Sequence, residues 1–195
     1  MKIVLASANR GKLVELAELL APLGITVESQ AAFGIEPAPE ERSTFVENAL
    51  DKARHTSLHS GLPALADDSG LVVPALGGAP GIRSARYAGA DGDDAANNAK
   101  LIAALADVAN PRAHFYCALV YLRHPQDPAP LIATARWHGE ILTSPRGHSG
   151  FGYDPLFYLP ELQRTAAELE PAEKNRRSHR GQAMTSLLEQ LRLEL

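Results

Sequence analysis

The chain has 195 residues, 45% hydrophobic and 22% charged, which are ordinary values for a globular protein and exclude a disordered chain, a coiled coil and a fibrous repeat. Its net charge of -4 and pI near 6.0 provide no general attraction to a polyanion, so we expect neither a nucleic acid nor a membrane as partner. The single cysteine, Cys117, allows no intrachain disulfide and lies in an apolar run, which predicts a core position. Every apolar run is too short for a signal peptide or a membrane span, so we expect a cytoplasmic protein.

The first elements are predicted to be a strand, a polar turn and a helix. An apolar run covers residues 2–6, the turn SANRGK follows at 7–12, and residues 12–24 have helical periodicity. The predicted buried face of this helix consists of leucines spaced three or four residues apart, at Leu13, Leu16, Leu20 and Leu23.

A second strand is predicted at residues 25–29, followed by a loop rich in proline and glutamate at 35–42. The next helix is predicted to begin near Thr44 and to end at about Ser60, because Thr44 and Glu47 have the spacing of a capping box. These elements alternate between strand and helix, as in α/β proteins.

The centre of the chain contains two short apolar runs, residues 63–68 and 71–76, which we interpret as two short strands. The first run ends in paired aspartates, so acidic groups are expected at a strand end. Residues 77–92 are predicted to form a loop and residues 94–107 a helix.

The last third is predicted to contain a pair of long strands, a short strand and a final helix. The long strands, 114–122 and 131–142, are separated by a turn and are expected to pair antiparallel; residues 156–159 form the short strand. Residues 178–195 have an amphipathic pattern with Leu187, Leu188 and Leu191 on one side. We therefore expect one α/β domain, residues 1–195, around a mixed sheet.

Three groups of residues suggest chemistry. The turn at 7–12 could receive phosphate on backbone N–H groups and Lys12 at a helix N-terminus, although a plain strand-to-helix turn has the same composition. It lacks the Walker spacing. Asp67 and Asp68 point to opposite sides of an extended chain, so one could face a magnesium ion while the other supports the loop; a surface turn is the alternative.

The other groups lie toward the C-terminus. The segment GFGYDP at 150–155 suits a loop that stacks on a flat base, but its two aromatic side chains could instead belong to the core. Cationic side chains that could bind an anion gather at the predicted start of the last helix, at Lys174, Arg176, Arg177, His179 and Arg180.

Taken together and in order, five segments closely resemble the inosine/xanthosine triphosphate pyrophosphatase family. They are SxNxxK at 7–12, DDSG at 67–70, LGGAPGIRSARYAG at 76–89, GFGYDP at 150–155, and EKN at 173–175 followed by SHRGQA at 178–183. The resemblance covers nearly the whole chain. It implies an elongated two-lobed α/β fold around a mixed twisted sheet, with a cleft between the lobes, and a homodimer.

The resemblance also implies an activity, the hydrolysis of non-standard purine nucleoside triphosphates (ITP, dITP and XTP) to monophosphate and pyrophosphate. Asp68 would be the catalytic carboxylate and, with Glu40 or its neighbour Glu41, would bind Mg²⁺. Water activated in this way would attack the α-phosphorus. The substrate contacts that the resemblance implies are Ser7, Ala8, Asn9, Arg10, Gly11, Lys12, Ser69, Phe151, Gly152, Tyr153, Asp154, Lys174, His179 and Arg180.

Overall fold

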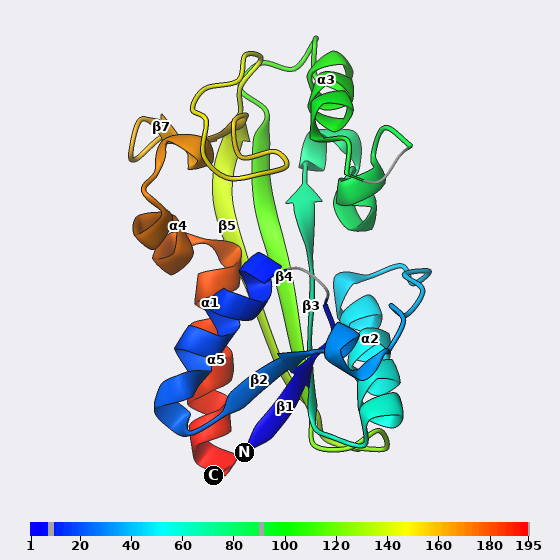
Figure 1. Ribbon diagram of the computed structural model, residues 1–195. Helices are drawn as coiled ribbons and strands as arrows, with labels where there is room; N and C mark the ends of the chain where they lie inside the picture. Colours follow the sequence, from blue (N-terminus) through cyan, green and yellow to red (C-terminus); the bar gives the residue numbers. More distant parts are fainter. Residues whose placement is uncertain (8–9, 90–91, 195) are drawn as a thin grey trace. The chain divides into compact units, whose positions relative to one another are not determined.

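The computed structural model describes residues 1–7, 10–89 and 92–194 (Figure 1). Its backbone contacts divide the chain into two compact units, each built from segments distant in sequence. Unit 1 consists of Met1–Asp68, Ala118–Thr134 and Ala183–Leu195, and unit 2 of Ser69–Cys117 and Ala135–Gln182. The chain therefore passes from one unit to the other within single strands.

Seven strands form one sheet in the order β2-β1-β3-β4-β5-β6-β7. Strand β1 runs parallel to β2 and to β3, whereas β6 runs antiparallel to β5 and to β7. The predicted mixed sheet is therefore confirmed, and the two long strands are neighbours in it. The strands are β1 (Lys2–Leu5), β2 (Thr26–Ser29), β3 (Ala64–Val72), β4 (Arg112–Leu122), β5 (Leu131–Ile141), β6 (Phe157–Leu159) and β7 (Arg164–Thr165).

Helices α1 (Arg10–Leu20), α2 (Phe45–Ser60) and most of α5 (His179–Glu194) belong to unit 1. Helix α1 packs against β2, and α2 packs against β1. Leu16 and Leu20 are fully buried, as the leucine spacing predicts. Thr44 caps α2, because its hydroxyl oxygen accepts the backbone N–H of Glu47 at 3.2 Å. The predicted strands at 2–6 and 25–29 correspond to β1 and β2, and the predicted helices at 12–24 and 44–60 correspond to α1 and α2. These four elements of unit 1 thus have the expected type and place.

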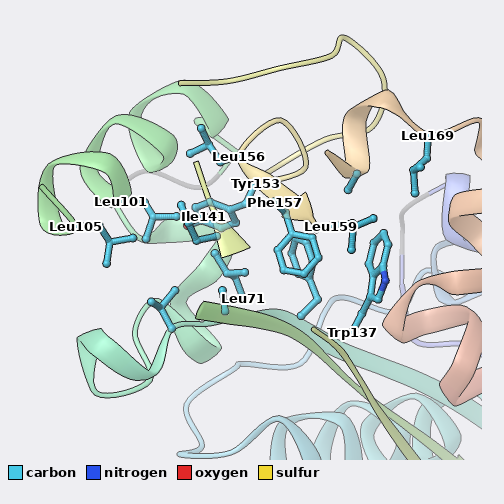
Figure 2. Packing of buried hydrophobic residues seen from close by; sticks show 14 residues of the cluster. Leu71, Leu101, Leu105, Trp137, Ile141, Tyr153, Leu156, Phe157, Leu159 and Leu169 are labelled. Carbon is cyan, nitrogen blue, oxygen red and sulfur yellow. The ribbon is translucent and has the colours of Figure 1, made fainter. Parts of the chain in front are cut away.

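The core of unit 2 is an aromatic and aliphatic cluster beneath helix α3 (Asp94–Ala104) (Figure 2). Phe115 lies with its ring centroid 4.6 Å from that of Phe157 and 6.4 Å from that of Trp137. Leu101 of α3 is fully buried against this cluster. Burial of such large rings dominates the stabilisation of a small unit, because apolar burial contributes about 25 cal/mol per Å².

The structure corrects the prediction of two short strands around the paired aspartates. Residues 64–72 form the single strand β3, so Asp67 and Asp68 lie inside a strand and not at its end. Gly70 lies inside this strand, and other backbone comes close to it: an added Cβ would lie 2.6 Å from the carbonyl oxygen of Gly81. This glycine marks a close approach of two chain segments.

Several short elements were not predicted. Residues 171–177, assigned above to the start of the last helix, form the separate helix α4 (Pro171–Arg177), because Ser178 has an extended backbone with ψ of 159°. Part of the predicted loop 77–92 forms the 3₁₀ helix η4 (Gly81–Arg86). The remaining 3₁₀ helices are η1 (Ala21–Leu23), η2 (Gln30–Phe33), η3 (Pro74–Leu76) and η5 (Ala166–Glu168). No helix among the described residues is both long and apolar enough to span a membrane.

Candidate functional site

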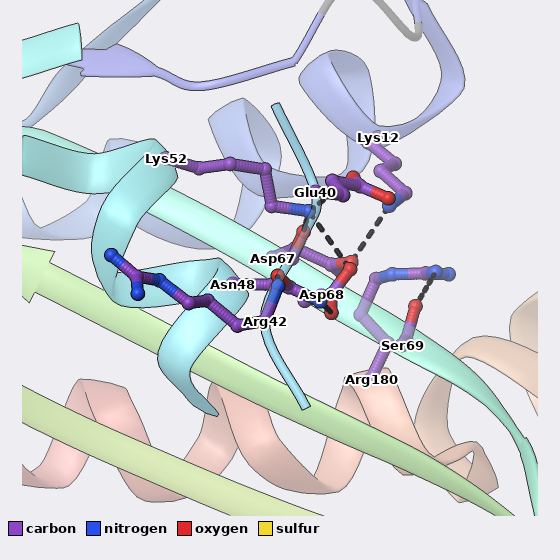
Figure 3. A network of polar contacts seen from close by, with 9 residues as sticks. All are labelled: Lys12, Glu40, Arg42, Asn48, Lys52, Asp67, Asp68, Ser69 and Arg180. Atoms are coloured by element: carbon purple, nitrogen blue, oxygen red, sulfur yellow. Dashed lines mark hydrogen bonds and ion pairs between the residues drawn. The ribbon is translucent and has the colours of Figure 1, made fainter. Parts of the chain in front are cut away.

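The ammonium of Lys52, on α2, joins several polar groups of unit 1. Its Nζ lies 2.9 Å from each of three oxygens: Oε1 of Glu40, the backbone oxygen of Asp67 and Oδ1 of Asp68 (Figure 3). The side chains of Lys52 and Asp68 are only 12% and 10% exposed, and that of Glu40 is 34% exposed. One buried cation therefore holds two carboxylates from segments far apart in sequence.

Helix α2 supplies a second contact to the same aspartate. Asn48 lies one helical turn before Lys52, so both side chains leave the same face of the helix. Its Nδ2 donates to Oδ2 of Asp68 at 3.2 Å, and its Oδ1 accepts the backbone N–H of Arg42 at 3.0 Å. Asn48 thus fixes Asp68 and also ties down the loop that carries Glu40.

The ionisation of this cluster departs from that of free side chains. Burial raises the pKa of Asp68; the charge of Lys52 and its hydrogen bond oppose this rise, and the charge of Glu40 adds to it. Burial lowers the pKa of Lys52, but the carboxylates of Asp68 and Glu40 outweigh it and leave that pKa above its usual value. Asp68 is therefore an aspartate that holds its proton to a higher pH than usual, next to a lysine that stays charged.

Asp67 faces the other side of β3 and binds a different cation. Its Oδ1 lies 2.7 Å from Nζ of Lys12, which is on the first turns of α1, and its side chain is fully buried. The prediction that the paired aspartates point to opposite sides is confirmed. Lys12 is held at a pocket of about 190 Å³ in unit 1, whose described lining consists of Ala6, Ser7, Lys12, Gln30, Pro37, Ala38, Glu40, Lys52 and Asp67.

The side chains of this pocket fit a magnesium ion bound mainly by its substrate. Glu40 lines the pocket, whereas Asp68 is outside its described lining and is joined to Glu40 by the Lys52 ammonium; hard carboxylate oxygens are the ligands that Mg²⁺ takes. Of the two glutamates considered, Glu40 bonds to Lys52, whereas Glu41 is exposed. Among the described residues no three His, Cys, Asp or Glu side chains form a metal cage. Such an ion would complete its shell with phosphate oxygens and water.

In unit 2, the loop at residues 150–154 presents one aromatic ring and buries the other. Phe151 is 61% exposed, whereas Tyr153 is 4% exposed and donates its hydroxyl proton to the backbone oxygen of Ser84 at 2.8 Å. Asp154 is buried, accepts the N–H of Phe151 at 2.9 Å and pairs with the ammonium of Lys174. Tyr153 therefore belongs to the core, as one interpretation of GFGYDP predicts, whereas stacking of the exposed Phe151 on a flat ligand stays a prediction.

Two further predicted residues lie at the start of α5. His179 stacks on Phe115 with ring centroids 4.9 Å apart and planes 13° apart. Arg180 is 8% exposed, and its Nη2 donates to Oγ of Ser69 at 3.3 Å. Both side chains are thus packed in place, as fixed hydrogen-bonding groups require.

The predicted substrate residues are therefore distributed over both units. Ser7, Lys12, Glu40 and Asp68 belong to unit 1; Ser69, Lys174, His179, Arg180 and the loop 151–154 belong to unit 2. Ala8 and Asn9 lie outside the described residues, and Arg10 and Gly11 begin α1.

The sequence reasoning missed Lys52 and Asn48. Their spacing of four residues on a predicted helix was visible, but nothing local tied that helix to Asp68.

A mixed α/β sheet with buried carboxylates, lysines at a small polar pocket and an exposed aromatic loop is typical of enzymes that act on nucleotide phosphates. Comparison with known proteins defines the class further. The Ham1 family matches residues 3–190. The dITP/XTP pyrophosphatase of Thioalkalivibrio sulfidiphilus is 58% identical over 193 residues, 98% of each chain. That of Aromatoleum aromaticum is 60% identical over 190 residues, 97% of this chain and 96% of its own.

A solved structure agrees with this match. The HAM1 protein from Coxiella burnetii superposes with a TM-score of 0.95 at 51% identity, with both chains fully covered. This protein therefore belongs to the Ham1 family.

Proposed function

We propose that this protein hydrolyses non-standard purine nucleoside triphosphates, ITP, dITP and XTP, to the monophosphate and pyrophosphate, and so cleanses the nucleotide pool. The observation that carries the proposal is the cluster in which Lys52 joins Asp68 to Glu40 at 2.9 Å each. It supplies a base of raised pKa, a fixed cation and two carboxylates suited to a metal ion. The names of the relatives, which are dITP/XTP pyrophosphatases, support the choice of substrate.

In this proposal Asp68 is the general base. Asn48 and Lys52 contact its two oxygens and hold them in a fixed orientation, so Asp68 can orient or deprotonate a water. Mg²⁺ bound by Asp68 and Glu40 would offset the charge of the phosphates. Lys12 binds phosphate at the pocket, oriented by Asp67.

In this proposal the residues of unit 2 recognise the purine base of the substrate. Phe151 stacks on the purine, and His179 and Arg180 donate to its 6-oxo group, which adenine replaces with an amino donor. Guanine keeps the 6-oxo group but adds a 2-amino donor, and leaving that donor buried and unpaired costs about 1–3 kcal/mol. We therefore expect ITP and XTP to be the best substrates, GTP a poorer one and ATP the poorest.

The test is kcat/KM for ITP, dITP, XTP, GTP and ATP, with pyrophosphate and orthophosphate measured separately. Equal values for ITP and ATP, or release of orthophosphate alone, contradict the proposal. Arg180→Ala should reduce the discrimination between ITP and ATP, provided that its circular dichroism spectrum matches wild type. Unchanged discrimination contradicts only the role of Arg180.

The identity of the metal, the location in the cell, the oligomeric state and the domain organisation belong to the same proposal. The metal is Mg²⁺, which is tested by removing it with EDTA and restoring activity with the chloride salt. The active form is a cytoplasmic homodimer of a single domain, residues 1–195, which analytical ultracentrifugation and cell fractionation test.

A further inference from the structure

Helix α3 binds the backbone N–H and the backbone carbonyl oxygen of one residue, Gly152, in the loop at residues 150–154. Oδ2 of Asp94 accepts the backbone N–H of Gly152 at 2.6 Å, and Nδ2 of Asn98 donates to the backbone oxygen of Gly152 at 3.0 Å. Asp94 and Asn98 are four residues apart, so they lie one above the other on the same face of the helix. The helix thus carries a two-point clamp for a single glycine.

The two hydrogen bonds from α3 hold Gly152, the residue that follows the exposed Phe151. On the other side of Phe151, Oδ2 of Asp154 accepts its N–H and pairs with Lys174. The flanking residues Gly150 and Gly152 have φ of +83° and +62°, in the left-handed region that glycine adopts without strain. The contacts from Asp94, Asn98 and Asp154 hold the backbone on both sides of Phe151, in addition to the buried Tyr153.

Asp94 is the acidic residue in the first turn of α3, but it does not cap the helix. Asp93 is the N-cap, with Oδ1 accepting the N–H of Ala96 at 2.8 Å, and Leu101 anchors the helix in the core. Asp94 instead forms a charge-assisted hydrogen bond with a loop 58 residues away in sequence. Its contact is therefore separable from helix stability, which makes Asp93 a matched control.

We propose that Asp94 and Asn98 are positioning residues that hold Phe151 ready to stack on a purine base. This inference rests on the proposed function, in which Phe151 contacts the base. The Gly152 peptide fixes the backbone beside Phe151, and Nζ of Lys174 lies 5.0 Å from the ring centroid on its other flank. Because the ring is ordered before the nucleotide arrives, binding does not require ordering of the loop.

The kinetic test compares Asp94→Ala and Asn98→Ala with Asp93→Ala. Stacking of a base on an aromatic ring contributes about 1–3 kcal/mol, so partial loss of the ring's position should raise KM for ITP about tenfold, with kcat within about threefold of wild type. Asp93→Ala should lower the melting temperature of the protein but leave KM unchanged. An equal rise of KM in Asp93→Ala overturns the inference, because the effect would then come from the helix.

A double-mutant cycle shows whether the effect passes through the ring. In a Phe151→Ala background, Asp94→Ala should cause no further rise in KM, because the group that it positions is already gone. Multiplicative effects of the two substitutions overturn the inference.

A measurement without substrate separates this inference from the proposed function. Exchange of the Gly152 amide proton, followed by NMR, should be faster in Asp94→Ala than in wild type and unchanged in Asp93→Ala. If wild type hydrolyses no triphosphate, the proposed function fails, and the exchange rates alone then decide whether the clamp exists. Equal exchange in wild type and Asp94→Ala overturns it.

Discussion

Replacing Lys52 with methionine should destabilise the metal-free protein in a pH-dependent manner. Methionine preserves much of the aliphatic stem and removes the ammonium, which lies 2.9 Å from carboxylate oxygens of both Asp68 and Glu40. At an effective dielectric constant of about 20, each contact has a Coulomb energy of about 6 kcal/mol, most of which is offset by desolvation. Removing one partner of a buried pair typically costs about 3–5 kcal/mol. We expect Lys52→Met to lower the free energy of unfolding by about 3 kcal/mol at pH 7.5, the lower end of this range, because Glu40 is 34% exposed and can be rehydrated.

The stability that Lys52→Met loses relative to wild type should be smaller at acidic pH. Lys52 lowers the pKa of Asp68, which burial raises, so the substitution moves this pKa further upward. A folded carboxyl with a raised pKa retains its proton where the unfolded one, with a pKa of about 3.9, has released it. Stability is then lost as pH rises through this window, so the deficit of the variant is smallest near pH 4 and grows toward neutrality.

The assay is urea unfolding in EDTA at pH 4.5 and 7.5. Lys2→Met is the control, since Lys2 forms a surface pair with Glu28 and should cost less than about 1 kcal/mol at either pH. If Lys52→Met lowers the free energy of unfolding by less than about 1 kcal/mol at pH 7.5, or by the same amount at both pH values, this account of the Lys52, Asp68 and Glu40 cluster is refuted.

Three other substitutions test single contacts. Asp68→Asn should lower kcat by about 10²–10⁴ with the fold intact by circular dichroism; near-normal kcat at saturating Mg²⁺ contradicts its role as base. Lys174→Ala should raise KM or lower kcat in steady-state assays with the fold intact by circular dichroism; unchanged kinetics contradict a role in substrate binding. Gly150→Ala should lower the melting temperature more than Gly34→Ala, because both have positive φ but only at Gly150 would a Cβ overlap the Asp154 carboxylate; equal shifts contradict this.

Much of the local structure follows from short-range pattern. The leucine spacing of α1, the Thr44 cap and the alternation of Asp67 and Asp68 depend only on neighbours in sequence, and the structure confirms each. The composition of GFGYDP likewise indicated a loop with an aromatic group. The order of the five motifs indicated the family, and through it Asp68 and Glu40 as the acidic residues of the site.

The tertiary structure alone decided what surrounds these residues. Residues 69–70 separate the two predicted strands, but they lie within the single strand β3, where the backbone of Gly81 comes close to Gly70. Lys52 has no local mark of function, since its three oxygen partners come from loop and strand residues that only folding brings to α2. Hydrogen bonds and ion pairs of this kind join residues distant in sequence, whereas helical and strand periodicity is a property of consecutive residues. Sequence by itself therefore determined the family and most of the longer elements and proposed the acidic residues, and packing decided which cation holds them.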